Sequence, residues 1–207
     1  MAEVKLTKSS LRAERVRLTQ LQRYLPTLQL KKAMLQMEVN EVQVEIQNLS
    51  SAFDEKRLRL SSSAGLMSEK FGLNYEETAK VRKIEKHYEN IAGVDIPIFE
   101  NVVFEPLNYS LLDTPAWLDA FVVDIQKMAV AKAKVLIAHE KKLVLEKELR
   151  EVTIRVNLFE KNLIPKAEQN IKKIKVFLGD QELAAVSQAK VAKTKIEMKK
   201  KAKGSIL

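Results

Sequence analysis

Few side chains in this sequence have the types and spacing that chemistry requires. Glu38, Glu41 and Glu45 recur at three- and four-residue intervals and share one face of a predicted helix. Such a strip could hold a metal ion or exchange protons, but this spacing is more typical of a solvated face or of a strip that meets a basic partner. His87 and His139 stand far apart, and no second histidine follows His139 at the helical spacing of a zinc motif. The sequence therefore predicts no catalytic residue, no metal site and no cofactor.

The composition also gives no sign of a nucleotide-binding site, and it favours long helices. The chain has 207 residues and a net charge of +9, with no cysteine, five glycines and five prolines. The glycines are too scattered for the phosphate-binding loops GxxxxGK[ST] or GxGxxG. So few turn residues nearly exclude a many-stranded sandwich or barrel and favour long helices. No apolar run exceeds four residues, as in Ala120–Val123, and the start lacks a signal peptide's apolar stretch. We therefore expect a cytoplasmic protein with no membrane span.

The N-terminal region, residues 1–60, is predicted to form one long coiled-coil helix. Between residues 18 and 60, alternating steps of three and four select thirteen positions, of which eleven are apolar. This seam comprises Leu18, Leu21, Leu25, Leu28, Lys32, Leu35, Val39, Val42, Ile46, Leu49, Phe53, Lys56 and Leu60. A repeat of 3.5 residues sustained over six heptads indicates a coiled coil.

The C-terminal region, residues 116–207, is predicted to form a second coiled-coil helix. Thr114 and Pro115 are suited to the N-cap and the first helical position. The seam passes through Trp117, Phe121, Asp124, Met128, Ala131, Val135, Ala138, Lys142, Leu145, Leu149, Val152, Val156, Phe159 and Leu163. After Leu163 two successive four-residue steps form a stutter, which coincides with Pro165, a residue without a backbone N–H. We therefore expect a local bend or unwinding there, followed by a lysine-rich end.

The central region, residues 61–115, breaks the heptad pattern with three glycines and three prolines. Ser61–Gly65 resembles a helix exit, and 75–90 could form a short helix. Val94–Phe99 and Val102–Phe104 are rich in β-branched and aromatic residues, which indicates two short strands joined near Glu100. We expect a small knob made of a short helix and a β-hairpin.

Neither apolar stripe would be stable alone in water, and the simplest partner for each is the other. The predicted fold is therefore all-α dominated: a long antiparallel two-helix coiled coil with a small central insert. If Leu60 faces Trp117, then Val42 faces Val135, and seam residues meet throughout. A register shifted by seven residues satisfies the pattern equally well.

The residues alone leave several functions open for a rod with a knob: a mechanical shaft, a tether, a chaperone-like clamp or a scaffold. A basic tail adds the alternative of nucleic-acid binding, although no aromatic residues are interleaved to stack on bases. This tail comprises Lys190, Lys193, Lys195, Lys199, Lys200, Lys201 and Lys203.

Two segments carry a resemblance to a known family. Residues 25–35, Leu-Pro-Thr-Leu-Gln-Leu-Lys-Lys-Ala-Met-Leu, resemble the N-terminal signature of the D subunit of V-type (A/V-type) ATPases and ATP synthases. Residues 155–165, Arg-Val-Asn-Leu-Phe-Glu-Lys-Asn-Leu-Ile-Pro, followed by Ile171, Ile174 and Leu178, resemble its C-terminal signature. The order of the two segments and the length of the chain agree with that family.

The resemblance implies a non-catalytic central-stalk rotor that transmits torque between the catalytic ring and the ion-translocating ring in the membrane. Its implied partners are the catalytic A and B subunits, the F subunit and a funnel-like subunit, and ATP would bind to the A/B ring. No nucleic acid is implied, and the location would be cytoplasmic and peripheral to the membrane. The resemblance assigns partner-binding roles to Pro26, Thr27, Leu28, Lys31, Lys32, Arg155, Val156, Asn157, Glu160, Ile164 and Pro165. The hairpin knob would present Ile96, Ile98, Phe99, Val102 and Phe104.

Overall fold

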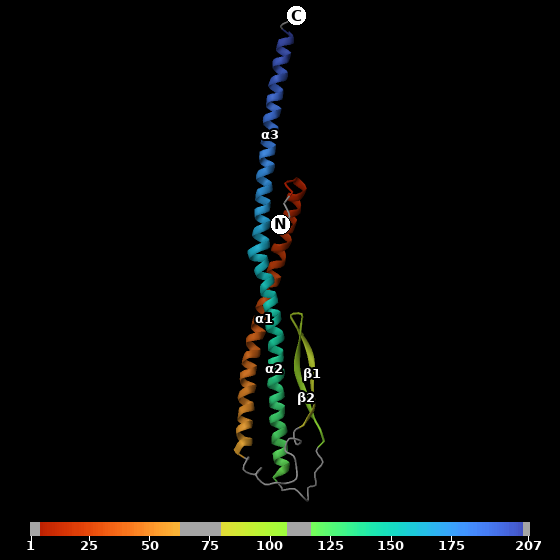
Figure 1. Ribbon diagram of the computed structural model, residues 1–207, viewed down its shortest axis with the longest axis vertical. Helices are drawn as coiled ribbons and strands as arrows, with labels where there is room; N and C mark the ends of the chain where they lie inside the picture. Colours follow the sequence, from red (N-terminus) through yellow and green to blue (C-terminus); the bar gives the residue numbers. More distant parts are fainter. Residues whose placement is uncertain (1–4, 63–79, 107–116, 205–207) are drawn as a thin grey trace. The chain divides into compact units, whose positions relative to one another are not determined.

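A computed structural model describes residues 5–62, 80–106 and 117–204 (Figure 1). In chain order, the elements are α1 (Lys8–Ser62), β1 (Val81–Ile91), β2 (Val94–Phe104), α2 (Leu118–Leu158), the π-helical turn η2 (Phe159–Leu163) and α3 (Ile164–Gly204). Of the predicted helix exit at Ser61–Gly65, residues 61 and 62 end α1 and residues 63–65 lie outside the described residues, as does the predicted helix start at Thr114. The chain divides into two compact units: Met1–Gln29 with Ile154–Leu207, called here the terminal unit, and Leu30–Thr153, called the hairpin unit.

The predicted helical hairpin is confirmed, and its apolar seam supplies the buried residues. α1 begins after Thr7, whose Oγ1 accepts a hydrogen bond from the backbone N–H of Ser10. The buried residues of α1 are Leu35, Val39, Val42 and Ile46. The buried seam residues of α2 are Phe121, Ala131, Ala138, Leu145, Val152 and Val156. Asp124 is the exposed exception on this seam and pairs with Lys127 at 3.2 Å.

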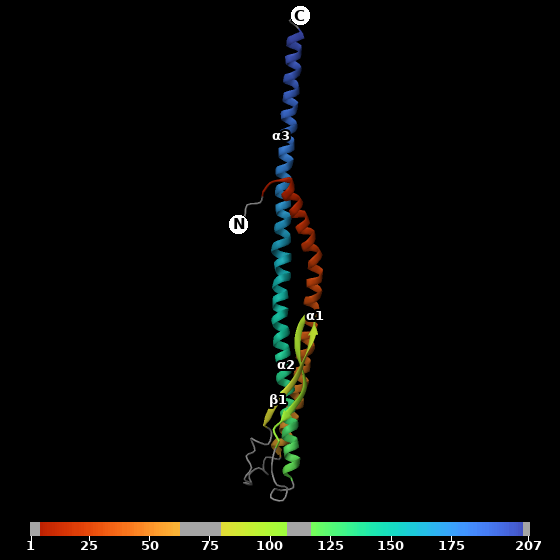
Figure 2. The same cartoon turned by 90° about the vertical axis from the view of Figure 1, so that its right-hand side faces the viewer.

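A second buried strip on α2 was not visible in the heptad pattern. It comprises Leu118, Val122, Ala133 and Ile137. Ile137 lines a cavity together with Ile98 and Phe99 of β2, so the hairpin covers this side of the helix. Figures 1 and 2 show β1 and β2 running alongside α2. The hairpin unit therefore packs three parts against one another: α1, α2 and the β-hairpin.

The predicted short helix and the predicted hairpin turn were both wrong. Residues 81–90 belong to β1, while 75–79 lie outside the described residues. β2 runs without interruption through Glu100, and the turn lies at Ala92 and Gly93, which have φ angles of 52° and 78°. Two positive φ angles suit a two-residue hairpin turn, because its twist matches that of the strands. Two register irregularities in the pairing of β1 with β2 disturb the alternation that would have revealed β1.

The turn predicts opposite effects for the same substitution at two glycines. Gly93→Ala should destabilise the hairpin by about 1 kcal/mol, because an L side chain rarely adopts a φ of +78°. Gly179→Ala should instead stabilise α3 by about 0.5–1 kcal/mol, since no atom would lie within 4 Å of the new Cβ. Amide hydrogen exchange in β1 and in α3 measures both changes. Unchanged protection of β1 in Gly93→Ala would contradict the strain argument.

Two ion pairs define the helix register within the hairpin unit. Lys141 Nζ lies 3.5 Å from Glu45, and Lys31 Nζ lies 2.9 Å from Glu148. With Val42 opposite Val135, Lys141 would lie nine residues, about 13 Å, beyond the level of Glu45. In the alternative shifted by seven residues, in which Val42 faces Lys142, Lys141 lies two residues from the level of Glu45, while Glu148 lies five residues from the level of Lys31. The predicted Val42–Val135 pairing was therefore wrong, because a seam that repeats every seven residues cannot distinguish these registers.

In the terminal unit, η2 accommodates the stutter predicted beside Pro165. The backbone N–H of Ile164 donates to Phe159 O, five residues back, so the helix is wider at this turn. Pro165 has no N–H to lose there. Beyond this turn the buried residues Ala167, Ile171 and Ile174 continue the seam in its new phase. The added turn thus keeps the apolar stripe on one face of the helix.

Candidate functional site

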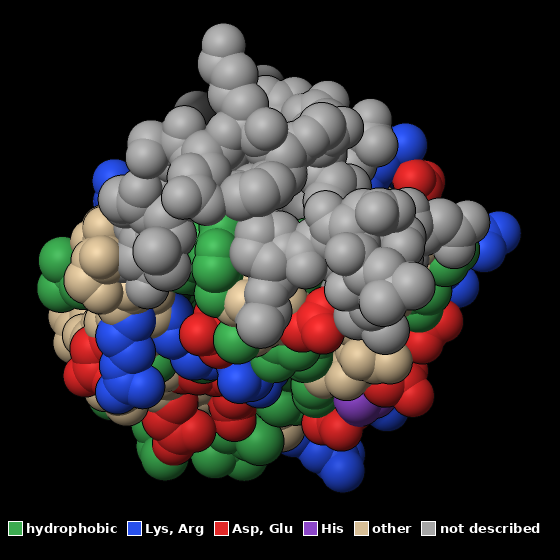
Figure 3. Space-filling view, turned by 90° about the horizontal axis from the view of Figure 1, so that it is seen from below, with side chains coloured by type: hydrophobic (Ala, Val, Ile, Leu, Met, Phe, Trp, Pro, Cys, Tyr) green, Lys and Arg blue, Asp and Glu red, His purple; other side chains and the backbone are tan. Residues whose placement is uncertain are grey.

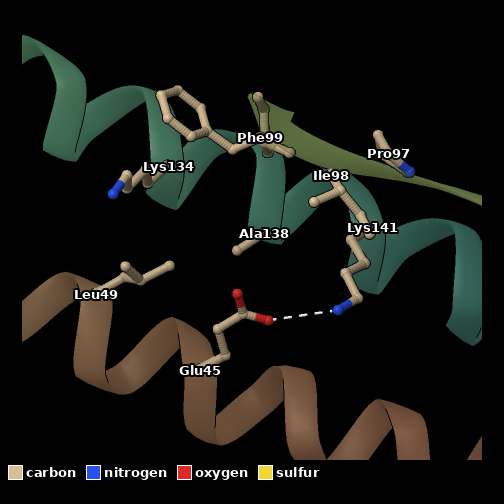
Figure 4. A pocket seen from close by; sticks show the side chains of 9 residues that line it. Glu45, Leu49, Pro97, Ile98, Phe99, Lys134, Ala138 and Lys141 are labelled. Carbon is tan, nitrogen blue, oxygen red and sulfur yellow. Dashed lines mark hydrogen bonds and ion pairs between the residues drawn. The ribbon is translucent and has the colours of Figure 1, made fainter. Parts of the chain in front are cut away.

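A cavity of about 280 Å³ lies in the hairpin unit between α1, α2 and β2. Its lining combines apolar side chains with three charged ones (Figure 4). The lining residues are Glu45, Leu49, Pro97, Ile98, Phe99, Lys134, Ile137, Ala138 and Lys141. The surface strip of α1 and α2 on which the hairpin lies, including this cavity, is called here the hairpin groove.

Two lysines approach the centre of the hairpin groove. The Lys141 side chain is only 18% exposed and contacts Glu45 at 3.5 Å. Lys134 instead places its ammonium over the ring of Phe99, 5.3 Å from the centroid. Figure 4 shows the Glu45 carboxylate between Lys134 and Lys141, with its ion pair to Lys141. The Glu45 carboxylate therefore pairs with Lys141, while the nearby Lys134 contacts Phe99.

A second pair of contacts joins β1 to the outer side of α2. Lys86 Nζ donates to both oxygens of Glu140, at 2.7 and 3.0 Å. This hydrogen bond raises the pKa of Lys86 above its ordinary value, against the opposing effect of burial, and Tyr88 raises it further. The Lys86 ammonium also lies 5.7 Å from the Tyr88 ring centroid. Lys86 therefore stays charged at neutral pH and links the hairpin to α2.

The hairpin tip reaches the other end of the hairpin groove. Asn90 Oδ1 accepts the backbone N–H of Gly93 at 3.1 Å, while Asn90 Nδ2 donates to Asp95 at 2.7 Å. A Cβ built on Gly93 would lie 3.9 Å from Lys31 Nζ, so the tip sits beside the Lys31–Glu148 ion pair. The hairpin therefore lies close to the Lys31–Glu148 and the Glu45–Lys141 ion pairs, which connect α1 with α2.

A hydrogen bond joins the two signature segments. Gln29 Nε2 donates to Glu160 in the terminal unit, which joins the N-terminal signature to the C-terminal one. Thr27 Oγ1 donates to the carbonyl of Tyr24 within α1 at 2.7 Å. Val156 is buried, Leu28, Lys31, Lys32, Ile164 and Pro165 are half-buried, and Pro26, Thr27, Arg155, Asn157 and Glu160 are exposed. Part of each signature thus contributes to pairing between the helices.

The predicted knob residues divide into buried and half-buried groups. Ile96 and Val102 are buried, while Ile98, Phe99 and Phe104 are half-buried. Ile98 and Phe99 line the cavity described above. The hairpin thus turns much of its apolar surface toward α2.

The remaining candidates do not assemble into a chemical site. Glu38 is half-buried, Glu41 and Glu45 are exposed, and only Glu45 forms an ion pair among the described residues. His87 lies 3.3 Å from Glu89, and His139 is exposed. In the described ranges, no group of three or more carboxylates or histidines could hold a metal ion. The helices described here include none that is long and apolar enough to cross a membrane.

Acidic and basic side chains are mixed in the hairpin unit, while the described part of α3 is basic toward its C-terminal end. Figure 3 shows acidic and basic side chains interspersed over the visible end of the hairpin unit. In α3, Lys190, Lys193 and Lys195 are exposed, and Glu197 is the acidic residue among them. This arrangement suits broad and weak contacts rather than one tight pocket.

Sequence reasoning singled out Glu45 as part of an acidic strip but missed the lysines of the hairpin groove, Lys134 and Lys141. Lys134 and Lys141 lie seven residues apart on α2, and Glu38 and Glu45 lie seven residues apart on α1. That shared spacing places each pair beside the seam of its helix and could have identified them. The contacts of Lys86 with Glu140 and of Phe99 with Lys134 depend on the position of the hairpin, and no spacing in the sequence indicates them.

Comparisons with known proteins agree on one family. The sequence profile of the ATP synthase D subunit matches residues 10–194. The D subunit of the V-type ATP synthase of Chlamydia abortus (strain DSM 27085 / S26/3) is 44% identical over 200 residues, covering 96% of each chain. The D subunit of the V-type ATP synthase of Chlamydia trachomatis serovar L2 is 45% identical over 201 residues, covering 96% of this chain and 98% of that protein.

Proposed function

This chain belongs to the family of ATP synthase D subunits, and we propose that it is the non-catalytic central rotor shaft of a V/A-type rotary ATPase or ATP synthase. The observation that carries this proposal is the match over nearly the whole chain to proteins of that name. The long antiparallel helices with a buried seam support it, because a shaft needs both helices to stay in register under load.

The proposed mechanism is mechanical. Rotation of the shaft presents a different face to each catalytic interface in turn, so that each interface favours a different nucleotide state. The shaft must leave each position easily, which requires many weak contacts. Interspersed charges provide such contacts, since an exposed ion pair contributes only about 0–1 kcal/mol.

The proposed partners are the catalytic A and B subunits, the F subunit and a funnel-like subunit that couples to the membrane ring. In this arrangement the A and B subunits bind ATP, while this chain carries no catalytic residue. The exposed lysines of α3 support placement of the C-terminal end within the catalytic ring. The complex would lie on the cytoplasmic side, peripheral to the membrane.

Co-purification tests the assignment. A tagged full-length chain should recover the A and B subunits and one small partner in constant ratio, and the ratio should survive a moderate salt wash. Recovery of the chain alone from cells that make the complex would contradict the proposal.

The same experiment addresses the nucleic-acid alternative, which rests on the lysines of the tail. If that alternative held, nucleic acid would be recovered and lost steeply as salt rises. Replacing Lys190, Lys193 and Lys195 by glutamine would then abolish this recovery. Under the rotor proposal, the same variant retains its protein partners outside the tail.

A further inference from the structure

The coiled coil has a second possible register, in which the Glu45–Lys141 ion pair breaks but other charged residues take the same relative positions. Moving α1 by seven residues along α2 would place Val42 opposite Val135, and the seam would remain largely apolar. Lys31 would then lie two residues from the level of Glu148, which is the offset that Glu45 and Lys141 show now. The hydrophobic pattern therefore cannot by itself exclude a slip of one heptad, about 10 Å.

Charges beside the seam repeat with the same period. Glu38 would take the present place of Glu45 beside Lys141, and Glu45 would move beside Lys134. The slipped register would thus offer three ion pairs, with Lys31–Glu148 retained. The observed register has two of this kind. Within the hairpin unit, ion pairs would therefore favour the register that the structure does not adopt, whereas the contacts of Lys8 with Glu182 and of Gln29 with Glu160 in the terminal unit favour the observed one.

The β-hairpin contacts Lys134, one of the lysines that would form an ion pair in the slipped register. The ammonium of Lys134 lies over the ring of Phe99 of β2, 5.3 Å from the centroid. Phe99 is half-buried and lines the same cavity as Ile137 of α2. Lys134 is attracted to the Phe99 ring, and it would lose this contact on forming an ion pair with Glu45.

We propose that Phe99 and Lys134 are positioning residues through which the β-hairpin selects the register of the coiled coil. They act on the alignment of α1 with α2, through the choice of partner for Glu45. The inference goes beyond the rotor assignment and does not depend on it, because it concerns contacts inside this chain.

Cysteine cross-linking in the full-length chain measures the register directly, since the chain has no cysteine of its own. One reporter carries Val42→Cys with Lys142→Cys, for the observed register. The other carries Val42→Cys with Val135→Cys, for the slipped register. In the otherwise unchanged chain, a short thiol cross-linker should join 42 to 142 and give little 42–135 product.

Phe99→Ala should raise the 42–135 product by about two- to fivefold, the factor expected for losing an exposed cation–π contact. Adding Lys134→Ala should reverse the rise, because Glu45 then has no new partner. Ile98→Ala is the matched control, since it removes apolar bulk from the same cavity without touching Lys134.

Three results would overturn the proposal: a Phe99→Ala chain of normal helicity with unchanged products, an equal rise in Ile98→Ala, or no reversal by Lys134→Ala. Far-UV circular dichroism and size-exclusion chromatography establish that each variant is folded and monomeric. If Phe99→Ala unfolds, Phe99→Leu keeps the bulk, removes the ring face and should give the same rise. Its failure to do so counts against the proposal.

Discussion

Val42→Pro should reduce ion pumping by the assembled complex much more than it reduces ATP turnover. Val42 is buried in the middle of α1, where proline removes a backbone hydrogen bond and costs about 3 kcal/mol or more. The kinked helix would still occupy the catalytic ring, but it would no longer carry torque along its length. ATP hydrolysis and ion uptake measured together in membrane vesicles give the coupling ratio.

Val42→Ala is the control for this experiment. It removes buried methyl groups at the same position but keeps the helix continuous, because alanine has the highest helix propensity. Its coupling ratio should stay close to that of the unaltered complex. Equal loss of turnover and pumping in Val42→Pro would argue against a shaft role, provided that the complex still assembles.

Leu145→Ala should lower the free energy of unfolding by about 2–5 kcal/mol. Leu145 lies on the seam of α2 and is 0% exposed, so the substitution loses apolar burial and leaves a cavity. Leu143, two residues away on the same helix, is 66% exposed, and Leu143→Ala should change stability by less than about 0.5 kcal/mol. Urea unfolding followed by far-UV circular dichroism measures both variants.

The comparison between Leu145 and Leu143 tests whether the seam, rather than helix propensity, stabilises the hairpin unit. Both variants make the same chemical change in the same helix, so their intrinsic helix propensities change equally. Similar losses at the two positions would mean that α2 is not held by the packing described above. A large loss at Leu145 alone would support it.

The family signatures acquire a structural meaning from the contacts between them. Gln29 and Glu160 come from opposite ends of the sequence and meet in the terminal unit. Val156 is buried in the helix that carries the C-terminal signature. Such residues stabilise helix pairing, and exposed ones such as Asn157 remain proposals for contact with other subunits.

Local sequence patterns did not predict strand β1 of the hairpin. Residues 81–90 lack the clean alternation of a strand, because two register irregularities displace their side chains. An isolated two-stranded hairpin is at most marginally stable in water. Its formation depends on the apolar side of α2 and on contacts such as Lys86 with Glu140, which join residues 54 positions apart.

The amino-acid sequence alone determined the two long helices, their apolar stripes and the unwinding beside Pro165. These features follow from local helix propensity and from the spacing of apolar residues, which can be read within a single segment. Tertiary structure decided the register, the strand β1 and the covered second face of α2. A seven-residue repeat pairs with itself at every heptad, so only contacts between distant segments, such as Glu45 with Lys141, distinguish one alignment from the next.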